Sequence, residues 1–313
     1  MRRQREPGLI ITGIAIVGQG SMGRMHAAAW AALGLGERIA YVCTPRPGPG
    51  LVGAPNARMV TSLKEVLDDE AVDIISVCTP TPTHADIAIR ALRAGKNVLL
   101  EKPIALTYPD AIAIADVAAA SSGMLMVAHV VRFFDGYRAL RQEWEAGRLG
   151  EVRSVTASRL SSAPGPASWI NDPALSGGPL VDFAIHDFDQ LNLFLGTPVA
   201  VTAVPGRGPG FIETTVEYEA GTGKVVSCTQ LPDDHPFSSS LEVTGTRATA
   251  AFSYPTATED SPYATQAAYF LACLRDGVEP RECSIDSAVQ ALRLSLAARQ
   301  SLEAGHTVQL AAR

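Results

Sequence analysis

A glycine motif near the N-terminus constrains the fold of this chain more than any other stretch. Residues 10–17 form a short apolar run rich in β-branched side chains, which predicts a buried strand. The run leads directly into the sequence GQGSMG at positions 18–23, and apolar residues then recur at helical spacing as far as Leu33. A strand, a Gly-x-Gly-x-x-Gly turn and a helix, in this order, are the context in which the motif binds a dinucleotide. The alternative is an ordinary glycine turn.

Each glycine of the motif has its own physical role. The first permits a tight turn, the second lets the backbone approach a pyrophosphate, and the third lets the helix pack close to the strand. The phosphate then meets the unpaired N–H groups and the positive end of the helix dipole. The residues that we expect to contact the dinucleotide here are Gly18, Gly20, Ser21, Met22 and Gly23.

The end of the second predicted strand, residues 38–43, bears on the choice of dinucleotide. NAD-binding chains carry an acid near this point that hydrogen-bonds the ribose hydroxyls. This chain has Thr44, Pro45 and Arg46 instead. Thr44 could donate a hydrogen bond to a 2′-phosphate and Arg46 could pair with it, so we favour NADP over NAD. The alternative is a surface turn in which Arg46 is solvated.

The first part of the chain alternates between predicted strands and helices. Strands are expected at 73–78, 97–100 and 124–130, with helices between them, which indicates a parallel sheet. Ligands of such sheets bind at the carboxyl ends of the strands. The further cofactor candidates at those ends are Thr79, Pro80, His84, Glu101 and Lys102. For His84, capping of the following helix is an alternative role.

The pattern changes after residue 130. Several successive runs of strand type, beside a few helices, predict a second domain of α+β class with a mainly antiparallel sheet. We therefore expect two domains, a dinucleotide-binding domain at 1–127 and a substrate-binding and oligomerisation domain at 128–313.

Residues 177–196 predict a mostly apolar helix that carries a polar stripe. Asp182, His186 and Asp189 fall at i, i+4 and i+7, on one face. Because unpartnered buried carboxylates are costly, such a stripe lines a cavity or meets specific partners. We expect Asp182 and His186 to be catalytic, whereas a structural hydrogen-bond network is the alternative. Asp187 and Asp189 are expected to orient Arg132 or the backbone.

Composition excludes several classes of function. The 313 residues carry a formal net charge of −6, which argues against a nucleic-acid surface. No apolar stretch is long enough to span a bilayer, and glycines interrupt the N-terminal apolar run, so we expect neither a membrane segment nor a signal peptide. The 5 cysteines are scattered without metal-type spacing, and we expect no metal. The expected location is the cytoplasm.

Taken together, these segments resemble the glucose–fructose oxidoreductase/inositol dehydrogenase (Gfo/Idh/MocA) family along nearly the whole chain. The segments that carry the resemblance are VGQGSMG (17–23), CTPTPTH (78–84), ALRAGKNVLLEKP (91–103), VRF (131–133) and GGPLVDFAIHD (177–187). The resemblance implies a Rossmann domain, an open-sheet substrate domain and a homo-oligomer, a dimer or tetramer. It also implies NAD(P)-linked chemistry on a sugar, sugar derivative or cyclitol, with Lys102, Asp182 and His186 as catalytic residues.

A mechanism follows from these assignments. His186 would take the proton of the substrate hydroxyl, because the unperturbed pKa of histidine, about 6.5, lies near cellular pH. Asp182 would orient that imidazole or bind a neighbouring hydroxyl, and Lys102 would supply positive charge where alkoxide character develops. We expect His186 and Lys102 to converge on one hydroxyl. Trp169 and Asn171 are further candidates for substrate contact.

Two other functions use the same scaffold. One is a sugar hydrolase or lyase that oxidises and re-reduces its substrate, so that the nicotinamide is used only transiently. The other is a non-catalytic NAD(P)-binding regulator, for which a basic DNA-binding module or loss of the Lys/His pair would be expected.

Overall fold

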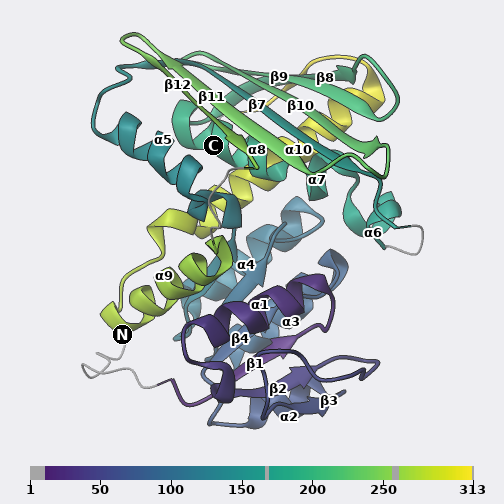
Figure 1. Ribbon diagram of the computed structural model, residues 1–313, viewed down its shortest axis with the longest axis vertical. Helices are drawn as coiled ribbons and strands as arrows, with labels where there is room; N and C mark the ends of the chain where they lie inside the picture. The colour runs from purple at the N-terminus through teal and green to yellow at the C-terminus, as the bar shows by residue number, and fades with distance from the viewer. Residues whose placement is uncertain (1–10, 166–168, 256–260, 312–313) are drawn as a thin grey trace. The chain divides into compact units, whose positions relative to one another are not determined.

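The computed structural model describes residues 11–165, 169–255 and 261–311 (Figure 1). By its internal contacts the chain divides into two units. The first comprises residues 1–133 and 261–286, and the second comprises 134–260 and 287–313. Within the described residues, no helix is both long and apolar enough to cross a membrane.

The first unit is built on a 6-stranded parallel sheet with the order β3-β2-β1-β4-β5-β6. Its strands are β1 (Ile14–Val17), β2 (Ile39–Cys43), β3 (Arg58–Val60), β4 (Ile74–Val77), β5 (Asn97–Glu101) and β6 (Leu125–Ala128). The central strands β1, β4 and β5 are buried at every residue. Continuous apolar runs of this kind are typical of parallel strands that are covered on both faces. The predicted Rossmann fold is confirmed.

Helices connect the strands of this sheet. They are α1 (Ser21–Ala32), α2 (Leu63–Asp68), α3 (His84–Arg93) and α4 (Tyr108–Ala120), with short 3₁₀ turns η1 (Gly36–Arg38), η2 (Thr81–Thr83) and η3 (Val130–Phe133). Strand order reverses between β1 and β4, so right-handed crossovers place α1 on one face and α3 and α4 on the other. This reversal is the switch point at which doubly wound sheets bind ligands.

A late segment of the chain completes the first unit. Helix α9 (Pro262–Asp276) packs against α1 and η3, and η5 (Arg281–Cys283) follows it. Phe270 and Leu274 of α9 share one hydrophobic cluster with Trp30 of α1. The unit therefore differs from the expected 1–127 domain in two respects, since it runs on to residue 133 and includes residues 261–286. The apolar face of α9 accounts for the second difference.

The second unit contains a 7-stranded sheet with the order β12-β11-β7-β10-β9-β8-β13. Its strands are β7 (Val152–Ser162), β8 (Pro198–Pro205), β9 (Phe211–Tyr218), β10 (Thr222–Leu231), β11 (Ser238–Gly245), β12 (Thr249–Tyr254) and β13 (Val308–Gln309). Strands β7 and β10 pair in parallel, and the other pairs are antiparallel, which confirms the predicted mainly antiparallel sheet.

Helices accompany this sheet within the second unit. They are α5 (Asp135–Glu145), α6 (Pro173–Ser176), α7 (Pro179–Asp182), α8 (Ile185–Leu195) and α10 (Ile285–Ala304), with η4 (Trp169–Asn171). Helix α8 packs on β7 and β10, and Figure 1 shows α8 and α10 behind the strands of the sheet. Apolar residues that alternate along β9 and β10 face this helical layer.

The predicted continuous helix over residues 177–196 is wrong in one respect, because it is interrupted. Helix α7 ends at Asp182 and α8 begins at Ile185. Between them the N–H of Ala184 donates to the carbonyl of Pro179, 2.9 Å away, a bond that spans five residues instead of four. Such a wider turn breaks the regular α-helical pattern. The polar stripe is therefore divided between two short helices.

Candidate functional site

The carboxyl edge of the first sheet brings the predicted cofactor residues together. In the strand register Val17 pairs with both Cys43 and Val77, and Val77 pairs with Leu100. The next residues along each strand therefore emerge in one row at this edge. The row consists of Gly18, Thr44, Cys78 and Glu101. Four segments that are distant in sequence are thus neighbours at the switch point.

The glycines of the motif meet the physical demands expected of them. Gly18 has a φ of +106°, and a Cβ there would lie 2.4 Å from the carbonyl oxygen of Cys78. At Gly23 a Cβ would lie 2.0 Å from the carbonyl oxygen of Gly18, so a side chain would push α1 away from β1. Substitution at either position requires the backbone to move.

The middle glycine faces open space instead. A Cβ on Gly20 would meet no described heavy atom within 4 Å. Gly20 is the N-cap of α1, and Ser21 and Met22 are the first residues of that helix. The N-terminal N–H groups of α1 thus adjoin space that a Cβ does not obstruct, which suits a pyrophosphate. These residues fit a dinucleotide.

The segment after β2 is held by the glycine loop. The side chain of Gln19 accepts a hydrogen bond from the N–H of Gly48 (2.9 Å) and donates one to the carbonyl of Pro49. Thr44 is buried, and its N–H donates to the carbonyl of Val60, 2.9 Å away. Arg46 is exposed. The turn is therefore anchored beside the motif and carries one exposed cation.

His84 is buried between two segments of the sheet edge. Its Nδ1 lies 2.8 Å from the carbonyl oxygen of Pro103, and its Nε2 lies 2.9 Å from that of Thr79. Burial lowers the pKa of His84, although these two carbonyl contacts oppose the shift. His84 is also the first residue of α3. Its side chain thus links the loop of Thr79 and Pro80 to the segment that follows Lys102, and it does not cap the helix.

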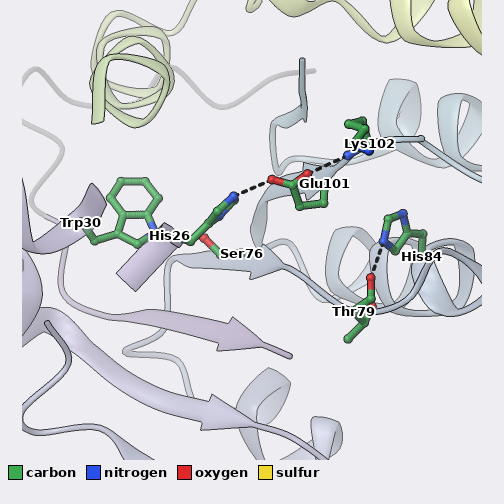
Figure 2. A network of polar contacts seen from close by, with 7 residues as sticks. All are labelled: His26, Trp30, Ser76, Thr79, His84, Glu101 and Lys102. Atoms are coloured by element: carbon green, nitrogen blue, oxygen red, sulfur yellow. Dashed lines mark hydrogen bonds and ion pairs between the residues drawn. The ribbon is translucent and has the colours of Figure 1, made fainter. Parts of the chain in front are cut away.

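Glu101 and Lys102 lie where β5 ends (Figure 2). The carboxylate of Glu101 is buried and makes two contacts. Its Oε1 lies 2.9 Å from Nε2 of His26, and its Oε2 accepts a hydrogen bond from the N–H of Lys102 at 3.2 Å. Lys102 itself is half-buried. The candidate lysine therefore follows β5, next to the strand that carries the Thr79 loop.

In the second unit, the candidate catalytic residues Asp182 and His186 lie at the junction of α7 and α8. Asp182 is the last residue of α7 and is half-buried, whereas His186 lies in the first turn of α8 with 9% of its surface exposed. Nine residues of α8 are buried, as the sequence predicts for a helix with so large an apolar surface. The junction thus carries a carboxylate and an imidazole on helices that are largely buried.

The partner of Asp187 differs from the sequence-based expectation. Asp187 binds the guanidinium of Arg159 on β7 through both oxygens, at 2.9 and 3.0 Å. Arg132 donates to the carbonyl of Glu282, 2.6 Å away. Burial alone would lower the pKa of Arg159, but the carboxylate of Asp187 outweighs it and raises that pKa.

Arg159 also contacts aromatic side chains at the α7–α8 junction. Its guanidinium carbon lies 5.8 Å from the ring centre of Phe183, in the junction itself, and 5.7 Å from that of Phe237. Arg159 was not identified from the sequence, because an arginine on a strand that alternates polar and apolar residues is expected to face solvent. The signal available was its neighbours, since Val155 and Ala157 share its face and are buried.

The remaining candidates, Trp169 and Asn171, belong to the second unit. Trp169 and Asn171 form η4, and the amide of Asn171 donates to the carbonyl of Gly165, 2.9 Å away, a local contact within its own loop. Across the ranges that the structure describes, no group of three His, Cys, Asp or Glu side chains could hold a metal ion.

A parallel sheet with a glycine-lined switch point, followed by a second domain with an open sheet, defines a class of NAD-binding oxidoreductases. Two family profiles match this chain. The "Oxidoreductase family, NAD-binding Rossmann fold" profile matches residues 12–129, and the "GFO/IDH/MocA C-terminal domain" profile matches residues 137–251. The chain belongs to the Gfo/Idh/MocA family of oxidoreductases, as the sequence motifs predicted.

Individual relatives agree with this assignment. An inositol 2-dehydrogenase of Rhizobium meliloti (strain 1021) is 36% identical over 193 residues, which cover 60% of this chain and 56% of that protein. The scyllo-inositol 2-dehydrogenase (NAD(+)) of Bacillus subtilis (strain 168) is 26% identical over 336 residues, covering 95% of both. The crystal structure of GenD2 from gentamicin A biosynthesis, in complex with NAD, superposes with a TM-score of 0.85 at 26% identity and covers 97% of both chains.

Proposed function

We propose that this protein is a dinucleotide-dependent dehydrogenase that acts on a secondary alcohol of a cyclitol, sugar or sugar derivative. The observation that carries the proposal is the arrangement at the first sheet, where Gly18, Thr79 and Lys102 follow the neighbouring strands β1, β4 and β5. The glycine turn and the candidate catalytic lysine therefore follow strands at the same edge of the sheet, which supports a shared site for cofactor and substrate. The names of the two inositol dehydrogenase relatives support the substrate class.

Each proposed catalytic residue has a role that its own surroundings support. His186 accepts the hydroxyl proton as imidazole during oxidation and, as imidazolium, returns it during reduction. Asp182 orients that imidazole or binds a neighbouring substrate hydroxyl. Lys102 stabilises the negative charge that develops on the reacting oxygen. A nicotinamide, when bound, supplies or accepts the hydride.

The form of the dinucleotide is a second part of the proposal. The family profile and the NAD complex of GenD2 support nicotinamide adenine dinucleotides in general. For the phosphorylated form, the support is local. The segment that follows β2 has no acidic residue at positions 44–46, and the guanidinium of Arg46 is exposed there. A 2′-phosphate would gain a cation there and would meet no carboxylate, so we propose NADP.

The proposal is tested by a substrate panel. Purified enzyme is incubated with myo-inositol, scyllo-inositol and simple aldoses, each with NAD⁺ and with NADP⁺, and reduction is followed by absorbance of the reduced nicotinamide. We expect at least one cyclitol or sugar to be oxidised, and Lys102→Ala to lower kcat by roughly a hundredfold or more.

The panel also separates the alternatives. Chemical change of a sugar without net reduction of the nicotinamide would instead indicate a hydrolase or lyase. Tight dinucleotide binding without turnover of any substrate would indicate a regulator. Either outcome contradicts the proposed dehydrogenase activity.

A further inference from the structure

A buried ion pair links the phosphate-binding helix to the segment that carries Lys102. His26 lies on α1 and has 2% of its surface exposed. Its Nε2 is 2.9 Å from Oε1 of Glu101, and the other oxygen of that carboxylate accepts the N–H of Lys102 at 3.2 Å. Figure 2 shows these three residues as one line of contacts from α1 to the end of β5.

Physical chemistry makes this link stronger than an ordinary surface contact. The side chains of His26 and Glu101 are only 2% and 6% exposed, so each would be costly to bury alone. Burial lowers the pKa of His26, but contacts with the Cys78 thiol and the Glu101 carboxylate outweigh it and raise that pKa to about 10. The imidazole is therefore a cation at neutral pH. A charge-assisted hydrogen bond of this kind fixes the carboxylate firmly.

The other side of Lys102 is held in a similar way. The carbonyl of Pro103, the next residue, lies 2.8 Å from Nδ1 of the buried His84. Two histidines, one on α1 and one at the start of α3, thus restrain the backbone on both sides of the candidate catalytic lysine.

The geometry points to His26 as a positioning residue for Lys102. It acts through Glu101, whose carboxylate it holds in the orientation that accepts the lysine N–H. His26 also joins the Lys102 segment to α1, the helix whose N-terminus fits the pyrophosphate. The same helix would therefore position both the cofactor and the ammonium group of Lys102. This inference rests on the proposed catalytic role of Lys102.

The same helix offers a matched control. One turn after His26, the indole N–H of Trp30 donates to the hydroxyl of Ser76 on β4 at 3.0 Å. Both side chains are fully buried, and the contact also joins α1 to the sheet. It involves neither Glu101 nor Lys102. Ser76→Ala therefore removes a buried contact between α1 and the sheet without touching the proposed link.

The experiment compares His26→Gln, His26→Asn, His26→Ala and Ser76→Ala. The amide nitrogen of Gln reaches about as far as Nε2 of histidine, whereas that of Asn is shorter by one carbon. Hydrogen exchange of a peptide covering residues 97–107 is measured in the dinucleotide-free enzyme. kcat and the KM for NADP⁺ or NAD⁺ are measured with the substrate that the panel identifies, and thermal unfolding is followed for every variant.

We expect His26→Asn and His26→Ala to speed exchange in this peptide and to lower kcat about tenfold or more, with little change in dinucleotide KM. His26→Gln should stay within about threefold of the parent in kcat. Ser76→Ala should lower the unfolding temperature and leave both kcat and the exchange of this peptide unchanged. The Gln/Asn comparison remains informative if His26→Ala fails to fold.

The inference is overturned if Gln performs no better than Asn, or if the His26 variants match Ser76→Ala in exchange and kcat. Failure of the proposed function gives a different pattern. A normal rate in Lys102→Ala would remove the lysine's role, while the exchange comparison would still decide whether His26 holds this segment.

Discussion

The carboxylate of Glu101 contacts His26 of α1 and the N–H of its own chain neighbour Lys102, and we have inferred that both contacts place Lys102. At the scale of residues, the proposed function depends on such buried polar contacts. Exposed residues contribute to ligand binding or catalysis through direct contacts with a ligand. Two predictions belong to this scale.

The first concerns Arg46. Replacing it with alanine removes the exposed cation after β2, so the Kd for NADP⁺ should rise about tenfold while that for NAD⁺ changes little. Arg38→Ala, an exposed arginine at the opposite end of the same strand, serves as the control. Titration calorimetry with both dinucleotides measures the effect. Equal changes for NAD⁺ and NADP⁺ would show that Arg46 does not contact a 2′-phosphate.

The second concerns His186. His186→Ala should lower kcat by about two to four orders of magnitude, because it removes the proton acceptor, and leave dinucleotide Kd nearly unchanged. His306→Ala is the matched control, since that exposed histidine contacts the carbonyl of its neighbour Thr307. Steady-state kinetics and a binding titration measure the two effects. A near-normal rate in His186→Ala would exclude the assigned role.

Several roles of individual residues could be predicted from the sequence. The tight turn at Gly18 and the close packing at Gly23 follow from a motif whose spacing has a physical meaning, and the structure shows a φ of +106° at Gly18 and a close approach at Gly23. His26 was not predicted. Its partner lies 75 residues away, and nothing local to α1 distinguishes a buried, paired histidine from an exposed one.

At the scale of elements, the α7–α8 junction depends on the buried pair of Arg159 and Asp187. Arg159→Met should destabilise the fold by about 3–5 kcal/mol, because it leaves a carboxylate buried without its partner. The double variant Arg159→Met/Asp187→Leu should recover part of that loss. Urea unfolding of the two single variants and the double variant measures the coupling. Additive losses would mean that the pair is not coupled.

The contact between α1 and β5 predicts a pH dependence. The pKa of His26 is raised to about 10 in the folded state from the ordinary value of 6.5, so its stabilisation is complete below about pH 6.5 and is lost as pH rises through 10. The difference in unfolding free energy between the parent and His26→Gln should therefore fall by about 1.4 kcal/mol per pH unit between pH 7 and 8.5.

The groups around His26 define that pH window. Burial raises the pKa of Cys78, although His26 opposes that shift, and Glu101 is the other ionisable partner of the imidazole. From α9, Tyr263 and Gln266 line the small cavity beside the ring. Denaturant unfolding at several pH values measures the difference. A difference that is constant with pH would show that the imidazole is neutral in the folded state.

Elements were predictable where periodicity and turn residues agree. The strand–helix alternation of the first sheet has both signals, and it is confirmed. The interruption between Asp182 and Ile185 has neither, because the apolar pattern continues unbroken through Phe183 and Ala184. At that break the ring of Phe183 contacts the guanidinium of Arg159, a residue of β7 that the local sequence does not reveal.

At the scale of the whole molecule, the family and the two sheet architectures could be predicted, whereas the path of the chain between the two units could not. Helix α9 has the composition of an ordinary core helix, and its apolar residues do not specify which sheet they cover. Its place in the first unit is set by the surface that α1 and η3 present. The proposed catalytic residues come from both units, Lys102 from the first and His186 from the second.

The central claim, hydride transfer between a nicotinamide and an alcohol carbon, is tested most directly by isotope tracing. The enzyme is incubated with NADP⁺ or NAD⁺ and myo-inositol or another active substrate deuterated at the carbon that is oxidised, and the reduced dinucleotide is analysed by mass spectrometry. We predict that one deuterium per turnover is recovered on the nicotinamide ring. Product formation with no deuterium in the dinucleotide pool, during or after turnover, would contradict the account.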